Sequence, residues 1–154
     1  MSGNRRTGRE LALKILYSLQ DQPSLERLLH DFWENFRFQE DLLGEPMEEF
    51  GEQVPWEVRR FAEELARGVA EHREELDRII GELSTNWALE RMARVDLALL
   101  RLGAFELLHR PQTPASVIIN EAVEIGKRFG TKETPSFVNG ILDRIARNHR
   151  PPTA

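Results

Sequence analysis

Three arginines close to the N-terminus, Arg5, Arg6 and Arg9, have the residue type and the spacing that suit phosphate binding. A guanidinium group presents a planar fork of N–H donors that matches the oxygens of a phosphate. Arg5 and Arg9 lie one helical turn apart, so both can face the same way. Because cations at a helix N-terminus oppose the helix macrodipole, the helix itself gains no stability from them. The cluster therefore favours a nucleic-acid ligand, and the alternative is a solvated, frayed terminus.

Two further places could bind an unpaired base. Tyr17, the only tyrosine, follows Arg9 by two helical turns and offers an aromatic face; the alternative is a boundary core residue with a solvated hydroxyl. Residues 130–140 combine a loop, a helix start with free amides, Lys132 and the aromatic Phe137. Helix N-termini attract phosphate, and aromatic rings stack on unpaired bases. The alternative there is a capped helix start with Phe137 in the core.

A carboxylate, Asp96, interrupts the most apolar part of the chain, residues 95–108. A carboxylate on a buried helix must either reach the surface or find a partner. Two partners remain open from the sequence: a nearby arginine of the same chain, or a second protein.

No enzyme motif accompanies these residues. The sequence has no glycine-rich dinucleotide or phosphate-binding loop and no zinc-protease motif. It has no cysteine, and its four histidines (His30, His72, His109 and His149) are scattered, with no second ligand at metal spacing. The sequence therefore predicts a binding protein without catalytic residues, metal or cofactor.

The composition is that of one globular domain of 154 residues with a net charge of −5. The charges are segregated, because both ends are basic while residues 38–58 hold seven acidic residues and no lysine or arginine. Local basic patches can bind phosphate whatever the total charge. No apolar run approaches the ~20 residues of a membrane span, and no secretory signal is present. We therefore expect a cytoplasmic protein with no membrane contact.

The elements that must position these residues are helices. Apolar residues recur at three- and four-residue spacing in residues 11–19, 25–36 and 58–83, the last as one long helix. A short helix with Trp87 follows, then a helix at 95–108 that is apolar all round and hence central. Thr113 and Thr134, each followed by proline, are predicted to cap the last two helices. Residues 39–55 are predicted to be a surface loop.

The predicted fold class is thus all-α, with about seven helices in two packed bundles. The division lies near the acidic loop or near the break at residues 84–86. With the second choice, the N-terminal sub-bundle spans about 5–83 and the C-terminal one about 84–148 of a single domain.

Four segments together resemble the NusB family of transcription antitermination factors. They are residues 5–17 (RRTGRELALKILY), 94–107 (RVDLALLRLGAFEL), 119–130 (INEAVEIGKRFG) and 137–143 (FVNGILD). The resemblance covers nearly the whole chain in order. It implies an all-helical, non-enzymatic protein that binds boxA RNA together with NusE, a ribosomal protein of the small subunit. Through that complex it would join RNA polymerase and other Nus factors and suppress premature termination in ribosomal RNA operons.

The resemblance also implies roles for single residues. The RNA-binding positions of the family fall on Arg5, Arg6, Arg9, Tyr17, Glu133 and Phe137, with Lys132 in the same loop. The positions facing NusE fall on Asp96, with Glu90 nearby. Thr7 and Gly8 dilute an arginine motif that is often denser, and Gly8 is expected to weaken the helix by ~1 kcal/mol.

Two other functions remain open from the sequence. One is an RNA-binding accessory domain of an rRNA cytosine methyltransferase, and the other is a helical scaffold that binds no RNA. A homodimer is also possible, since Trp33, Phe36 and Phe38 could form an apolar pairing face.

Overall fold

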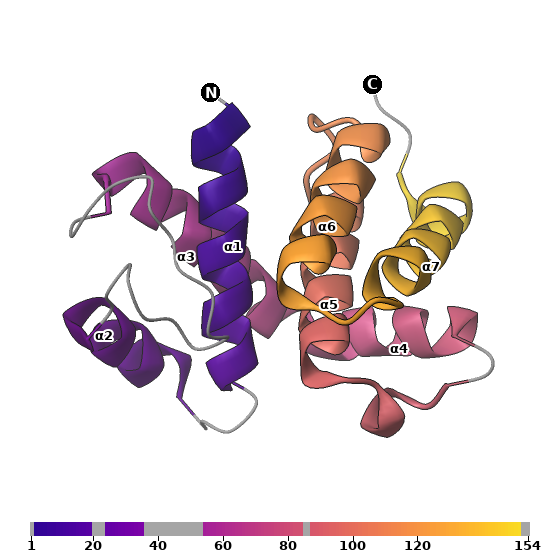
Figure 1. Cartoon of the computed structure of the whole chain (residues 1–154), viewed down its shortest axis with the longest axis horizontal. Coiled ribbons are helices and arrows are strands. Elements are labelled where there is room, and N and C mark those ends of the chain that lie inside the picture. Colours follow the sequence, from indigo (N-terminus) through magenta and orange to yellow (C-terminus); the bar gives the residue numbers. More distant parts are fainter. Residues whose placement is uncertain (1, 20–23, 36–53, 85–86, 152–154) are drawn as a thin grey trace. The chain divides into compact units, whose positions relative to one another are not determined.

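Every regular element that the structure describes is a helix. The computed structural model of the chain describes residues 2–19, 24–35, 54–84 and 87–151, and no strand occurs in these ranges. The helices are α1 (Ser2–Leu19), α2 (Leu25–Asn35), α3 (Trp56–Glu71), α4 (Arg73–Leu83), the 3₁₀ turn η1 (Leu89–Arg91), α5 (Arg94–His109), α6 (Ala115–Phe129) and α7 (Thr134–His149) (Figure 1). The all-α prediction is confirmed. None of these helices is long and apolar enough to cross a membrane.

The chain divides into two compact units, Met1–Arg67 and Gly68–Ala154. The sequence suggested a division at the acidic loop or near residue 84. In the structure α4 packs against α5 and α7, so it belongs with the C-terminal helices. The reason is the apolar face of α4, where Leu76, Ile79 and Ile80 are all buried.

The first unit is held by apolar packing of α1 and by polar links between α2 and α3. The predicted apolar face of α1 is buried, with Leu11, Ala12 and Ile15 completely inaccessible to solvent. On α2, the Trp33 Nε1–H donates to Glu63 Oε2 at 2.6 Å. The buried face and this cross-link fix α3 in the unit, and α3 supplies the ring against which the N-terminal arginines lie.

A second link joins Arg67 on α3 to Glu26 on α2, which the guanidinium holds with both terminal nitrogens. The hydrogen bond from Arg67 lowers the pKa of the Glu26 carboxyl below its ordinary value. The carboxyl thus remains charged, and paired, at lower pH than a free glutamate would.

The second unit is built around α5. All residues from Leu97 to Leu107 on this helix are buried, which confirms the prediction that the helix apolar all round is central. Helices α4, α6 and α7 all pack against it. The buried Arg101 on α5 is paired with Asp77 on α4, with nitrogen–oxygen distances of 2.7 and 2.9 Å. A buried guanidinium needs such a partner, and the pair also fixes α4 on the central helix.

The predicted single helix at 58–83 is wrong, because the chain turns at His72 between α3 and α4. His72 leaves helical geometry with φ −108° and ψ 17°. The backbone hydrogen bonds from His72 N–H to the Gly68 carbonyl and from Leu76 N–H to the His72 carbonyl persist at 3.1 and 2.9 Å. The chain therefore leaves helical geometry at one residue while these two backbone hydrogen bonds are kept. The apolar stripe has a gap at this point, between Val69 and Leu76, and that gap is the only sign of the turn in the periodicity.

Several helix starts also differ from the predictions. Pro114, not Thr113, occupies the N-cap position of α6, and Glu133, not Thr134, occupies that of α7. In place of the short helix at Trp87 there is only the three-residue turn η1. The acidic loop lies largely outside the described residues, as do Phe36 and Phe38 of the suggested pairing face. The homodimer therefore stays a prediction.

Candidate nucleic-acid and partner interfaces

The N-terminal arginines share one aromatic ring in the first unit. The guanidinium carbons of Arg5 and Arg9 lie 4.4 and 5.6 Å from the centre of the Phe61 ring on α3. This confirms that the two side chains face the same way. A cation over a ring face is stabilised by about 0.5–1 kcal/mol at exposed sites. The terminus is thus helical and packed at these residues, and Arg5 is held in place while remaining exposed.

The three arginines differ in their access to solvent. Arg5 is exposed, Arg6 is half-buried, and Arg9 is only 5% exposed. A guanidinium that is almost covered can contribute to the local potential, but it presents few donors to a phosphate. Arg5 is therefore the arginine best placed for direct contact, whereas Arg9 packs near the Phe61 ring out of reach of solvent.

Gly8 has a structural reason to stand within this arginine motif. A Cβ atom at Gly8 would lie 2.5 Å from Phe61 Cδ2, closer than van der Waals contact allows. Gly8 and the neighbouring Thr7 are both buried. The glycine lets α1 approach the ring that carries the arginines, so its low helix propensity is compensated by packing.

Tyr17 lies near the C-terminal end of α1 and is half-buried. It follows Arg9 by eight residues, which is about 12 Å along a helix axis. Tyr17 is thus separated from Arg9 by more than two turns of α1.

In the second unit, two consecutive hydrogen bonds fix the turn that carries Lys132 and Glu133. The Thr131 N–H donates to Thr134 Oγ1 at 2.9 Å, and the Thr134 hydroxyl donates to Asp96 Oδ1 at 2.6 Å. Thr134 is completely buried, whereas Lys132 and Glu133 are exposed. The partner of Asp96 is therefore a threonine, and neither of the partners left open by the sequence is needed to explain its position.

Gly130 allows this arrangement by close approach, not by an unusual backbone angle. It ends α6, as predicted for a C-terminal glycine, but with φ −99°, which any residue can adopt. A Cβ there would lie 2.4 Å from Thr134 Oγ1. The glycine thus lets the buried hydroxyl reach both of its partners.

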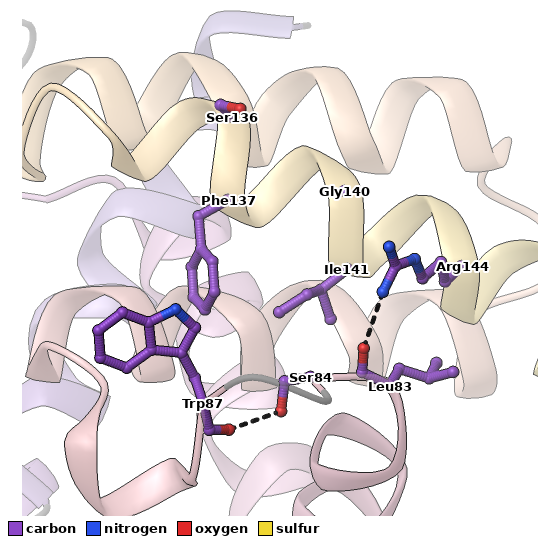
Figure 2. A pocket seen from close by; sticks show the side chains of 8 residues that line it. All are labelled: Leu83, Ser84, Trp87, Ser136, Phe137, Gly140, Ile141 and Arg144. Atoms are coloured by element: carbon purple, nitrogen blue, oxygen red, sulfur yellow. Dashed lines mark hydrogen bonds between the residues drawn. The ribbon is translucent and has the colours of Figure 1, made fainter.

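Phe137 lines a surface hollow together with Trp87, and Figure 2 shows the two rings directed toward the same space. The hollow has a volume of about 290 Å³, near the lower end of the range for small-molecule pockets. Trp87 is 51% exposed and Phe137 is half-buried. The neighbouring Val138 is completely buried, so Val138 and not Phe137 is the core residue at the start of α7.

The rim of the hollow is polar. Arg144 on α7 donates to the Leu83 carbonyl at 3.0 Å, and the Ser84 hydroxyl donates to the Trp87 carbonyl at 3.1 Å (Figure 2). The remaining lining residues are Ser136, Gly140 and Ile141. Sequence reasoning missed Trp87 and Arg144 as site residues, although a tryptophan beside a helix break was a usable signal. Two aromatic rings with a guanidinium at the rim can bind a planar, anionic ligand such as a nucleotide.

The two carboxylates that are predicted to face a partner protein differ in their exposure and in their hydrogen bonding. Glu90 in η1 is exposed, whereas Asp96 in the first turn of α5 is half-buried and bonded to Thr134. A second protein could therefore contact Glu90 directly, but contact with Asp96 would act on a carboxylate that already has a structural bond.

The fold also brings together residues that the sequence keeps far apart. His72, Glu75 and His109 offer ligand atoms that all lie within 4.8 Å of one another. The sequence analysis found no second ligand for any histidine and so missed Glu75, which stands three residues after His72. His109 is brought to this pair only by the packing of α4 on α5.

Known proteins resemble this chain over nearly its whole length. A sequence model of the NusB family matches residues 6–147. Transcription antitermination protein NusB of Syntrophotalea carbinolica is 65% identical over 153 residues, which cover 99% of this chain and 98% of the relative. The protein of the same name in Sorangium cellulosum is 46% identical over 147 residues, 95% and 94% of the two chains.

Solved structures agree on the fold. T. maritima NusB superimposes with a TM-score of 0.76 at 33% identity, covering 96% of this chain and 93% of that one. A structure of antitermination factors NusB and NusE in complex with dsRNA gives a TM-score of 0.73 at 20% identity, covering 97% and 100%. Because the sequence identity is only 20%, the similarity to this NusB–NusE–dsRNA structure concerns the fold alone.

Proposed function

Since this chain belongs to the NusB family, we propose that its two sets of site residues form the RNA contacts of a transcription antitermination factor. The chain is an RNA-binding antitermination protein and not an enzyme, in keeping with its relatives. The relatives are matched over 94–98% of their own length and are named for antitermination. The methyltransferase accessory domain and the inert scaffold are therefore set aside.

The hollow beside Phe137 is the observation that carries the RNA site in the second unit. An unpaired base placed there would stack on Trp87 or Phe137, and Arg144 would lie near its phosphate. Stacking of one base on an aromatic side chain contributes about 1–3 kcal/mol. Lys132, at the turn before α7, adds a cation to the same helix start, where backbone amides already favour anions. The proposed ligand is boxA-type single-stranded RNA.

In the first unit, Arg5 is the proposed phosphate contact, with Arg6 and the buried Arg9 adding positive potential. Tyr17 extends this surface along α1. Each phosphate contact to a single strand steepens the dependence of log K on log salt concentration by about 0.7. Arg5 is thus expected to act on affinity and salt dependence, and the aromatic hollow on sequence preference.

We further propose that NusE binds this chain through a surface that includes Glu90 and the region of Asp96. A solved relative of similar fold has NusE and RNA bound. If NusE extends the RNA surface, the two binding reactions are linked and each strengthens the other. Through this complex the chain would act on RNA polymerase with other Nus factors, in the cytoplasm.

The test is fluorescence anisotropy with a labelled boxA RNA, with and without NusE. Trp87→Ala and Phe137→Ala should each weaken RNA binding about tenfold, the equivalent of ~1.4 kcal/mol at the lower part of the stacking range. Arg5→Gln should weaken binding and reduce the salt slope by about 0.7.

Two matched variants serve as controls. Trp56→Ala removes the other strongly exposed tryptophan, which is 66% exposed and lies outside both sites. Arg78→Gln removes an exposed arginine of α4 that forms an ion pair with Glu82 and lines neither site. Both should leave RNA affinity unchanged. Equal losses in control and site variants would refute the assignment of these residues.

A further inference from the structure

His72, Glu75 and His109 form a compact ligand set on the surface of the second unit. The His109 Nε2 lies 2.8 Å from Glu75 Oε1, and the His72 Nδ1 lies 3.8 Å from the same oxygen. The two imidazole rings are stacked with centres 4.0 Å apart and planes 20° from parallel. Both nitrogens thus lie within 3.8 Å of one carboxylate oxygen, and they belong to neighbouring, nearly parallel rings.

The arrangement is prepared by the fold. His72 is the residue at which the chain turns between α3 and α4, Glu75 lies in the first turn of α4, and His109 ends α5. The buried Phe105 stacks on both imidazoles, with ring centres 5.9 and 5.4 Å away. Each ligand residue therefore lies at a helix end that the core holds in place, and both imidazole rings pack on the apolar ring of Phe105.

The distances are close to those that a tetrahedral metal ion requires. Zn²⁺ binds histidine nitrogen at about 2.0–2.1 Å and carboxylate oxygen at about 2.0–2.2 Å, so tetrahedral ligand atoms lie about 3.4 Å apart. The observed separations of 2.8 and 3.8 Å, with none beyond 4.8 Å, fall on both sides of that value. Small side-chain rotations would place all three atoms around one ion.

The surroundings favour a cation. Glu71, Glu74 and Asp77 line the same open hollow, opposed by one cation, Arg73. Asp77 is already paired with Arg101 and is not needed as a ligand. The ligand side chains are 30–42% exposed, so an ion can reach them without opening the core.

We propose that His72, Glu75 and His109 bind one divalent transition-metal ion of the Zn²⁺ class, with water in the fourth position. Two imidazoles and one carboxylate are a zinc ligand set with an open position. Bound metal would tie the start of α4 to the end of α5. The site is independent of the residues assigned above to RNA, so RNA binding is not required for it.

The test is titration of the purified chain with Zn²⁺, followed by competition with a chromophoric chelator. One equivalent should bind to the wild-type chain. Loss of only the outer partner of a metal ligand costs about 10–100-fold in affinity, so His72→Gln and His109→Gln should each weaken binding at least about tenfold. His149→Gln is the matched control, because His149 lies 4.0 Å from the single carboxylate of Glu82 in the same unit.

A second measurement needs no variant. Histidine side-chain NMR of the wild-type chain should show Zn²⁺-dependent shifts at His72 Nδ1 and His109 Nε2, while His149 stays unchanged. Thermal unfolding of the second unit should move to higher temperature with Zn²⁺, because a ligand that binds only the folded state stabilises it. The proposal is overturned if these nitrogens do not respond to Zn²⁺, or if His149→Gln lowers affinity as much as His72→Gln.

Discussion

The hydrogen bond from the Thr134 hydroxyl to Asp96 gives a direct test of what this carboxylate does. The bond is 2.6 Å long, its donor is completely buried, and it anchors the turn that carries Lys132 and Glu133. The perturbation is Asp96→Ala, which removes the acceptor and leaves the buried hydroxyl to find another.

The loss of folding free energy in Asp96→Ala can be estimated from the contacts of this carboxylate. A hydrogen bond to a charged group contributes about 1.5–3 kcal/mol, and an acidic residue in the first turn of a helix adds about 0.3–1 kcal/mol. Two features reduce the loss: Asp96 is half-buried, and Thr131 Oγ1 lies 3.3 Å from the Thr134 hydroxyl as a substitute partner. We expect a destabilisation of about 1–2 kcal/mol, equivalent to a fall in Tm of about 2–8 °C in a chain of this size.

The assay is thermal and urea unfolding followed by circular dichroism. Asp96→Asn is the control, because its amide oxygen still accepts the hydrogen bond, and it should cost less than about 1 kcal/mol. Thr134→Val removes the donor. A double-mutant cycle of Asp96→Ala with Thr134→Val should show a coupling energy of about 0.5–1.5 kcal/mol, since the residues are in direct contact.

Measuring NusE binding distinguishes a structural role of Asp96 from a role in binding the partner protein. If Asp96 also faces NusE, Asp96→Asn should weaken NusE binding while the unfolding curve hardly moves, and Asp96→Lys should abolish it with helicity retained. Additive losses in the cycle, or an Asp96→Ala variant as stable as wild type, would refute the structural role of this carboxylate.

Three further predictions concern stability. Because Arg67 lowers the pKa of Glu26 in the folded state, this pair stabilises the fold above pH 4.5, the ordinary pKa of the group. The stabilisation is lost as the pH falls through the lowered pKa of the folded state. In urea unfolding, Glu26→Gln should therefore be less stable than wild type at neutral pH and equal to it in strong acid. Gly8→Ala should destabilise the chain despite the ~1 kcal/mol gain in helix propensity, because its Cβ would displace Phe61, and thermal unfolding should show a lower Tm. Gly140→Ala, where nothing lies within 4 Å of the added Cβ, should instead raise stability by about 0.5–1 kcal/mol in the same assay.

Local pattern was sufficient to predict much of this protein. The three- and four-residue spacing of apolar side chains predicted the all-α class, and the uniform apolarity of residues 95–108 predicted the central place of α5. The one-turn spacing of Arg5 and Arg9 predicted their common direction. These features follow from helix geometry, in which sequence separation alone fixes which side chains share a face.

Tertiary structure decided the features that depend on residues distant in the sequence. The glycine at position 8 is explained only by the neighbouring Phe61 ring, and the position of the Asp96 carboxylate only by its hydrogen bond with Thr134. The hollow at Phe137 exists only because α7 packs against the segment that carries Trp87. His72 and His109 meet because α4 packs on α5. No periodicity encodes such pairs, since side-chain contacts between helices depend on how the buried faces pack, and that is settled by the whole core at once.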